Sequence, residues 1–265
     1  MAKIVVMGAG IGGISQIYEL RKALGKEHEL MLVGDSDRFE FTPSNPWVAV
    51  GWRKEKQITV DLPDLMKKHG IGFSGVGVRR LHADDSCLEL NDDTTLEYDY
   101  LVIATGPKLA FEEVEGLGPD GHTQSICKTG HAASAHIDFQ ELVDNPGPVI
   151  VGAAPMASCF GPAYEYLFIL DTELKKRKIR DKVPMHFVTP EPYIGHLGLD
   201  GVGDTKSMLE SEMRDRHVHW TTNAKITKVE DGKMHFTEVD SAGDVRKEHE
   251  LEFRHSMILP AFKGV

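Results

Sequence analysis

The sequence predicts an α/β protein built from two parallel-sheet units, each extended by an antiparallel meander. An apolar run at residues 3–7 leads into a glycine-rich turn at 8–13 and then into an amphipathic segment. A looser repeat of this order begins at residue 148, and short β runs follow both units. Strand, glycine turn and helix in this order are typical of dinucleotide-binding folds. We therefore expect two Rossmann-like folds, each with a β meander, the second incomplete.

The first half of the chain carries one whole unit. Short apolar runs are typical of buried parallel strands, and Gly25 is placed to end the first helix. Short β runs between residues 71 and 98 are separated by acidic turns, which predicts the meander. The other expected elements are strands at 3–7, 29–33 and 100–104, helices at 14–24 and 61–69, and a loop at 41–51.

The second half repeats this plan. We expect strands at 148–151 and 185–188, helices at 161–178 and 205–217, short β runs through 253 and a last apolar stretch at 257–259. The chain then stops where a further strand and loop would follow. The expected domains are a first at 1–110, a crossover at 111–146, and a second at 147–265 that is incomplete at its C-terminal end.

The composition excludes several classes of function. Of 265 residues, 30 are basic and 41 acidic, and the formal net charge of −11 repels nucleic-acid phosphates. The basic residues at 175–180 lie near the end of an expected helix, where cations complement the helix dipole. No apolar run reaches the roughly 18 residues of a membrane span, and the first strand begins too early for a cleavable signal. We therefore expect a cytoplasmic chain.

The first glycine turn predicts a pyrophosphate site. In the G-x-G-x-x-G spacing, the first glycine allows a tight turn, the second lets the backbone approach a pyrophosphate, and the third lets the helix pack on the strand. An acidic residue that ends the second strand takes a ribose hydroxyl, but here Gly34 holds that place and Asp35 follows it. A glycine-rich turn without a ligand is the alternative. The expected site residues are Gly8, Ala9, Gly10, Ile11, Gly12, Gly13, Gly34 and Asp35.

The segment at 98–106 favours FAD over NAD in this first site. Its sequence, YDYLVIATG, resembles the segment of flavoprotein disulfide reductase-like enzymes that follows the meander and passes beside the cofactor. The resemblance places Ala104, Thr105 and Gly106 near FAD, and Val78, at the end of an earlier strand, near the adenine.

The second glycine turn predicts no NAD(P) site. Glycines would be needed at 152, 154 and 157, but Ala154 and Ala157 stand at two of these positions. Pro155 also removes a backbone N–H where a phosphate would be held. The electrons should therefore come from a donor other than NAD(P)H.

The three cysteines are too far apart for a Cys-x-x-Cys motif, a disulfide scaffold or a zinc site. Cys87 lies in a meander strand, where a small buried hydrophobe is expected. Cys127 lies on the crossover. Cys159 starts an expected helix, whose N-terminus would lower the pKa of the thiol. For Cys127 and Cys159, spacing alone leaves redox chemistry and a structural role both open.

Longer motifs resemble the membrane-associated bacterial sulfide:quinone oxidoreductases, relatives of flavocytochrome c sulfide dehydrogenase. The resemblance runs through essentially the whole chain. Its segments are PSNPW at 43–47, VGW at 50–52, YLVIATGPKLAF at 100–111, QSIC at 124–127, ASCFGPAYEY at 157–166, EPYIGHLGLDGVG at 191–203 and PAFKGV at 260–265.

The resemblance implies that two electrons pass from sulfide through a cysteine persulfide and FAD to a membrane quinone. It implies that Cys159 takes the sulfur, that Cys127 is an additional cysteine, and that Glu165 moves protons near Cys159. For His131 and His196, an ordinary hydrogen-bonded histidine is the alternative. The further implied residues are His131 and His196 for activity, and Thr42, Ser44 and Asn45 for the FAD site.

Chains of this family are longer. The partner cysteine of Cys159, the second FAD-contacting strand, the quinone pocket and the amphipathic membrane anchor have no counterpart here, so Cys127 would have to replace the partner. We expect peripheral membrane association for the full-length enzyme and leave a homo-oligomer open. The alternatives are a single-subunit NADH:quinone oxidoreductase-like enzyme and a catalytically silent flavin-binding fragment.

Overall fold

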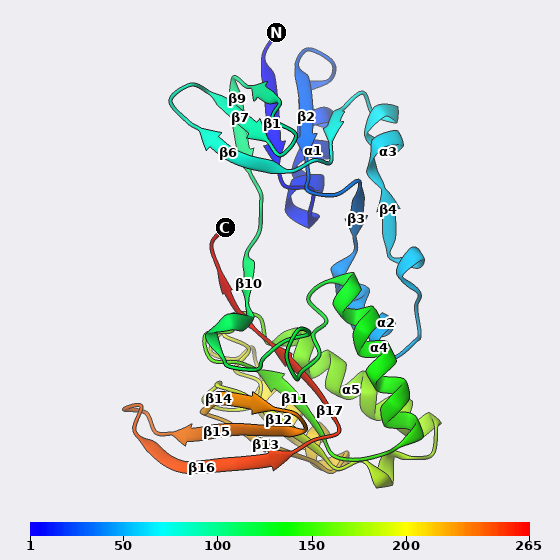
Figure 1. Ribbon diagram of the computed structural model, residues 1–265, viewed down its shortest axis with the longest axis vertical. Helices are drawn as coiled ribbons and strands as arrows, with labels where there is room; N and C mark the ends of the chain where they lie inside the picture. The colour runs from blue at the N-terminus through cyan, green and yellow to red at the C-terminus, as the bar shows by residue number, and fades with distance from the viewer. The chain divides into compact units, whose positions relative to one another are not determined.

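The computed structural model describes residues 1–265 as two compact units. Unit 1 comprises Met1–Phe41, Lys56–Lys108 and Gly264–Val265, and unit 2 comprises Thr42–Glu55 and Leu109–Lys263. Each unit holds a four-stranded parallel sheet and a three-stranded antiparallel meander (Figure 1). This confirms the expected α/β fold with two Rossmann-like sheets.

In unit 1 the parallel sheet has the strand order β5-β2-β1-β9. Its strands pair in register, with Ile4 of β1 opposite both Leu30 and Tyr100. The strands are β1 (Lys3–Met7), β2 (Glu29–Val33), β5 (Gly72–Ser74) and β9 (Tyr100–Ile103), and the meander is β6 (Val78–His82), β7 (Cys87–Leu90) and β8 (Thr95–Glu97). The remaining elements are β3 (Arg38–Glu40), β4 (Thr59–Asp61), α1 (Ile11–Leu24) and α3 (Leu62–Lys68).

Alternate residues of β1 and β2 face opposite sides of this sheet. Val6 and Leu32 pack with Ile17 of α1 and with α3. Val5 and Val33 pack instead against Leu88 and Leu90 of the meander. The parallel sheet is thus covered on both faces, which explains why its strands are continuously apolar.

Unit 2 repeats the plan with the strand order β13-β12-β11-β17. Its parallel strands are β11 (Val149–Ala153), β12 (Met185–Val188), β13 (Val218–Thr221) and β17 (His255–Leu259). Its meander is β14 (Ala224–Glu230), β15 (Lys233–Val239) and β16 (Val245–Glu252), and β10 (Lys108–Ala110) pairs with β18 (Ala261–Lys263). Its helices are α2 (Asn45–Ala49), α4 (Thr129–Asp144), α5 (Gly161–Lys176) and α6 (Thr205–Asp215).

The parallel sheet of unit 2 is likewise covered on both faces. Ile150 of β11, Val188 of β12 and Ile258 of β17 pack against the meander residues Ile226 and Phe236. Helices α4 and α5 lie on the other side of the sheet, in contact with β17 and β11 (Figure 1).

Two helices lie where no helix was expected. The segment 41–51, expected as a loop, contains α2, with Pro46 in its first turn. The segment 111–146 contains α4, whose buried residues Ala132, Ala135, Phe139 and Leu142 follow a helical period. Helix α1 also begins at Ile11, three residues before the expected start, because the glycine turn forms its first turn.

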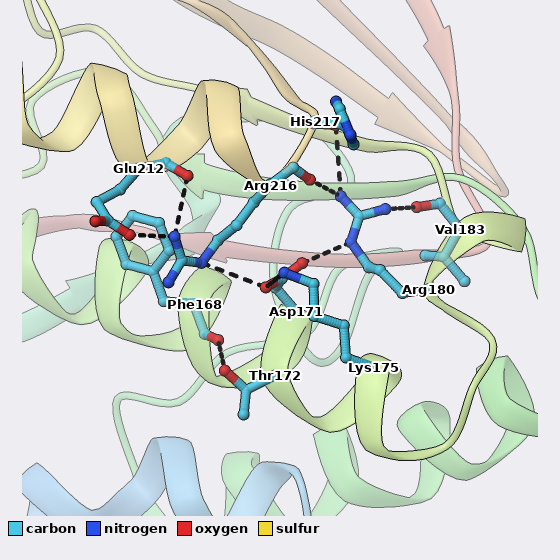
Figure 2. Close-up of polar contacts among 9 residues, drawn as sticks. All are labelled: Phe168, Asp171, Thr172, Lys175, Arg180, Val183, Glu212, Arg216 and His217. Atoms are coloured by element: carbon cyan, nitrogen blue, oxygen red, sulfur yellow. Dashed lines mark hydrogen bonds and ion pairs between the residues drawn. The ribbon is translucent and has the colours of Figure 1, made fainter.

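A buried carboxylate joins α5 to the end of α6. Asp171 is 1% exposed, and Figure 2 shows its carboxylate among three cations. Lys175 Nζ lies 2.8 Å from Oδ2, Arg180 Nε 2.7 Å from Oδ1, and Arg216 Nε 3.3 Å from Oδ2. Arg180 also donates to the carbonyl oxygens of Val183 and Arg216. Two basic residues of the run at 175–180, Lys175 and Arg180, therefore have a buried acidic partner.

None of the helices combines the length and the apolar character that crossing a bilayer requires.

Candidate functional site

The glycine turn of unit 1 is shaped by close backbone contacts. Gly8 has φ of +114°, and a Cβ there would lie 2.1 Å from the carbonyl oxygen of Ala104. A Cβ on Gly13 would lie 1.7 Å from the carbonyl oxygen of Gly8. Neither position accepts a side chain, so both glycines bring strand, turn and helix together.

The middle of the same turn is open. A Cβ on Gly10 or Gly12 would meet no atom within 4 Å. Gly10 caps α1, and the first four N–H groups of a helix have no partner within it. Open space in front of a helix N-terminus suits a pyrophosphate, so the turn fits a dinucleotide such as FAD.

The neighbouring residues of unit 1 surround this turn. A Cβ on Gly34 would lie 2.7 Å from Cβ of Ala9, and Asp35 beside it is exposed. Val78 is the first residue of β6, whereas the sequence reading placed it at a strand end. Ala104 donates its N–H to the Met7 carbonyl oxygen at 2.7 Å. Besides Asp35, the exposed residues of the expected site in unit 1 are Gly10, Ile11, Gly12, Thr105 and Gly106.

The corresponding turn of unit 2 is closed. A Cβ on Gly152 would lie 1.8 Å from the Val188 carbonyl oxygen, so this glycine serves strand packing. The N–H of Ala154 donates to the Leu259 carbonyl oxygen at 2.8 Å, and Pro155 has no N–H. Helix α5 begins only at Gly161. Two of the backbone positions that would hold a phosphate, at 154 and 155, therefore offer no free donor.

Two cysteine-bearing segments lie at the parallel sheet of unit 2. Cys159 lies between β11 and α5. The segment before Cys127 runs parallel to β17, where Gln124 donates to Ser256 at 2.7 Å and accepts from Ile258 at 3.2 Å. Strands β11 and β17 are neighbours, and the carboxyl ends of parallel strands are the usual place of sites in such folds.

The pKa of the Cys127 thiol depends on Cys159 as well as on burial. Burial is the main cause that raises the pKa of the Cys127 thiol, and the negative charge of a Cys159 thiolate raises it further. A hydrogen bond from Ser125 acts in the opposite direction. Burial also raises the pKa of the exposed Cys159. The expected lowering by a helix N-terminus is wrong, because Cys159 precedes even the cap residue Phe160 of α5.

Asn45, expected at the FAD site, lies against the Cys127 segment. Its side chain is fully buried, and its Nδ2 donates to the Ile126 carbonyl oxygen at 2.8 Å. Its Oδ1 accepts from the Thr129 hydroxyl at 3.2 Å. Asn45 therefore holds both sides of Cys127. Thr42 and Ser44 form a 3-10 turn before α2.

Glu165 and His131 lie on the helices that follow the two cysteines. Glu165 is exposed on α5, six positions after Cys159. His131 is in the first turn of α4, with its ring centroid 5.8 Å from that of Phe111. Cys87 lies in β7 of unit 1 and is half-buried.

His196 lies in a tight turn before α6. Its Nδ1 accepts from the Gly198 N–H at 3.2 Å, and its Nε2 lies 3.5 Å from Asp200 Oδ1. The turn is held by Tyr164 and Glu191, which sequence reasoning did not select. Both lie within the quoted family segments, but only their burial, at 4% and 2% exposure, sets them apart.

The chain is similar in sequence and in structure to sulfide:quinone oxidoreductases. The chain is 40% identical over all 265 residues to the "Sulfide-quinone reductase" of Aquifex aeolicus, of which it covers 60%. It superposes on the crystal structure of the sulfide:quinone oxidoreductase of that bacterium with a TM-score of 0.93, covering 100% of this chain and 60% of the other. The chain thus spans about 60% of the length of these relatives.

More distant likenesses concern the fold. The structure of NDH2 from Plasmodium falciparum in complex with NADH matches with a TM-score of 0.79 at 15% identity, covering 100% of this chain and 56% of that chain. Residues 2–259 match the family described as "Pyridine nucleotide-disulphide oxidoreductase". With nearly its whole length matched and both parallel sheets in place, the chain belongs to the pyridine nucleotide-disulphide oxidoreductase family.

Proposed function

We propose that this chain carries the sulfide-oxidising site of a sulfide:quinone oxidoreductase. The observation that carries the proposal is the placement of Cys127 and Cys159 at the carboxyl ends of one parallel sheet, close enough for the charge of one to act on the other. The identity of 40% to a sulfide-quinone reductase over the whole chain supports it.

The chemistry we infer is a two-electron oxidation of sulfide. An S–S bond forms between hydrosulfide and the Sγ of Cys159, the proton of the thiol and the proton of hydrosulfide both leave, and the two electrons released would be taken up by FAD. Cys159 is exposed and can be reached by a small anion, whereas Cys127 is half-buried beside it. Glu165 is exposed on the helix that follows Cys159 and is suited to take the proton.

The electron acceptor we infer is FAD, held by unit 1. The first turn of α1, with Gly10 and Gly12 open to a ligand, would bind the pyrophosphate. FAD, when bound, supplies the acceptor for the electron pair and the route to a quinone. Gly34, Asp35 and the exposed residues Thr105 and Gly106 are the further candidates for contact with the cofactor.

An NADH:quinone oxidoreductase is the second candidate, because NDH2 shares the fold. The closed turn of unit 2 argues against it. The N–H of Ala154 is used by Leu259, and Gly152 packs against Val188. A nicotinamide dinucleotide would find no free backbone cradle there.

The first experiment is an anaerobic absorption spectrum of the chain loaded with FAD, before and after sulfide and, separately, NADH. We expect sulfide to bleach the flavin bands or to produce a long-wavelength charge-transfer band, and NADH to leave them unchanged. Cys159→Ser should abolish the response to sulfide. Cys87→Ser is the matched control, since Cys87 lies in a meander strand of unit 1, and it should respond like the unchanged chain.

Reduction by NADH but not by sulfide would replace the proposal with the NADH:quinone oxidoreductase. Flavin that binds and ignores both reductants would identify a catalytically silent flavin-binding chain, which also contradicts the proposal. An unaltered sulfide response in Cys159→Ser would remove Cys159 from the site.

A further inference from the structure

We propose that Tyr164 and Glu191 are positioning residues that hold His196 at the sulfide site. The inference rests on the proposed function, in which His196 is a candidate of that site. It assigns the placement of His196 to two side chains that do not themselves take part in the chemistry.

The two side chains hold the backbone on both sides of His196. The Gly195 N–H donates to the Tyr164 hydroxyl at 3.0 Å, and the Leu197 N–H donates to Glu191 Oε1 at 2.6 Å. The Tyr164 hydroxyl itself donates to Glu191 Oε2 at 2.7 Å. Helix α5 and the segment after β12 are thereby linked through the turn that carries His196.

Glu191 is suited to this task because all its partners are donors. Its side chain is buried, and Thr189 Oγ1 donates to Oε2 at 2.8 Å in addition to Tyr164. A buried carboxylate accepts such bonds strongly when it is ionised. Burial and the charge of Glu191 raise the pKa of Tyr164, so its hydroxyl stays protonated and keeps donating.

The turn needs support from outside itself. Leu197 has φ of +56°, a left-handed conformation that costs a side-chain-bearing residue free energy, and Gly195 has φ of +82°. The bonds to Tyr164 and Glu191 fall on these same two residues. Backbone of this kind persists only where its surroundings hold it.

The turn lies against the cysteine segment. A Cβ on Gly198 would be 3.4 Å from the Phe160 ring and 3.9 Å from the Ser158 carbonyl oxygen, so Gly198 lies close to both neighbours of Cys159. The N–H of Gly198 donates to Nδ1 of His196. This bond sets the tautomer of the neutral ring, with the proton on Nε2.

Tyr164→Phe tests the proposal, with Tyr166→Phe as its matched control. Tyr166 is an equally buried tyrosine of the same helix, but its hydroxyl is bonded to His255 instead of the turn. We expect hydrogen exchange at the Gly195 amide, which loses its acceptor in Tyr164→Phe, to accelerate about fivefold or more, the factor that corresponds to one lost net hydrogen bond. The Leu197 amide, whose acceptor Glu191 loses the Tyr164 donor, should accelerate less. Tyr166→Phe should leave both amides unchanged.

The tautomer of His196 separates positioning from general stabilisation. Ring ¹⁵N shifts should report the Nε2–H form in the unchanged chain and in Tyr166→Phe, and a mixture of both tautomers in Tyr164→Phe and Glu191→Gln. Sulfide reduction of bound flavin should slow about tenfold or more in the same two variants, as misplaced groups cost rate.

Unchanged exchange and an unchanged tautomer in Tyr164→Phe would overturn the proposal. Released amides with an undiminished sulfide reaction would overturn it as well, because His196 would then need no positioning. If the unchanged chain fails to respond to sulfide, the proposed function fails, while exchange and tautomer still decide whether the two residues hold His196.

Discussion

At the scale of single residues, the glycines of the first turn divide into two kinds. Gly8 and Gly13 are needed because backbone oxygens lie where a Cβ would be, and one of these oxygens belongs to Gly8 itself. Gly10 and Gly12 have no such neighbour, so their lack of a side chain leaves room for a ligand. The same motif therefore serves packing at its ends and leaves its middle open, where we propose that a pyrophosphate binds.

Gly13→Ala should destabilise the apo chain by about 1–3 kcal/mol, because the added Cβ forces the backbone of Gly8 or α1 to move. Gly12→Ala is the control on the same helix, and it should be neutral or raise stability by up to about 1 kcal/mol, since alanine favours the helix. Urea unfolding followed by circular dichroism measures both. Equal effects of the two substitutions would contradict this division. FAD affinity should fall in both variants.

At the scale of elements, the ion pairs of Asp171 decide how α5 meets α6. One buried carboxylate faces Lys175, Arg180 and Arg216, and Glu212 also pairs with Arg216 (Figure 2). In the sequence, residues 175–180 form a basic run, but in the structure Asp171 neutralises part of its charge inside unit 2.

Asp171→Asn should lower the free energy of unfolding by about 3 kcal/mol, because three cations lose a buried partner. The control is Glu115→Gln in the same unit, whose carboxylate is 76% exposed and lies 3.6 Å from Lys228. Exposed pairs contribute about 0–1 kcal/mol, so this change should be small. Urea midpoints and slopes give both values. A loss below about 1 kcal/mol in Asp171→Asn would show that the cluster does not stabilise unit 2.

Helix α4 shows how an element can be missed although its signal is present. Its buried residues recur at helical spacing, but many are alanines, which count little in an apolar pattern. Helix α2 has only five residues and begins with Asn and Pro, which read as a turn. The burial of short or alanine-rich helices depends on the elements that pack on them, so their own sequence indicates it only weakly.

At the scale of the whole molecule, stability should depend on pH through the packing of sheet on meander in unit 2. His186 of β12 donates to or accepts from Thr221 at 2.9 Å, and its ring lies 6.5 Å from that of Phe236. Burial, followed by the charges of His219 and His249, lowers the pKa of His186 to about 4.

Lowering the pH from about 6.5 to about 4 should destabilise the chain. The unfolded state takes up a proton on His186 near 6.5, while the folded state does not until near 4, so protons favour unfolding across this window. The free energy of unfolding should fall by at most about 3 kcal/mol across this window. His186→Gln should remove this part of the slope, and His122→Gln, which alters an exposed histidine, should not. Urea midpoints at a series of pH values test this, and an unchanged slope in His186→Gln would refute it.

The sequence by itself determined the succession of strand, glycine turn and helix that begins both units, the α/β fold and the resemblance to sulfide:quinone oxidoreductases, but not helices α2 and α4. These signals are local, since apolar periodicity and glycine spacing are set within a few neighbouring residues. The tertiary structure decided where Asn45 bonds, which direction the thiol pKa values shift, and that Tyr164 and Glu191 hold His196. Each of these depends on burial and on bonds between residues 6 to 84 positions apart, which only the packed chain brings together.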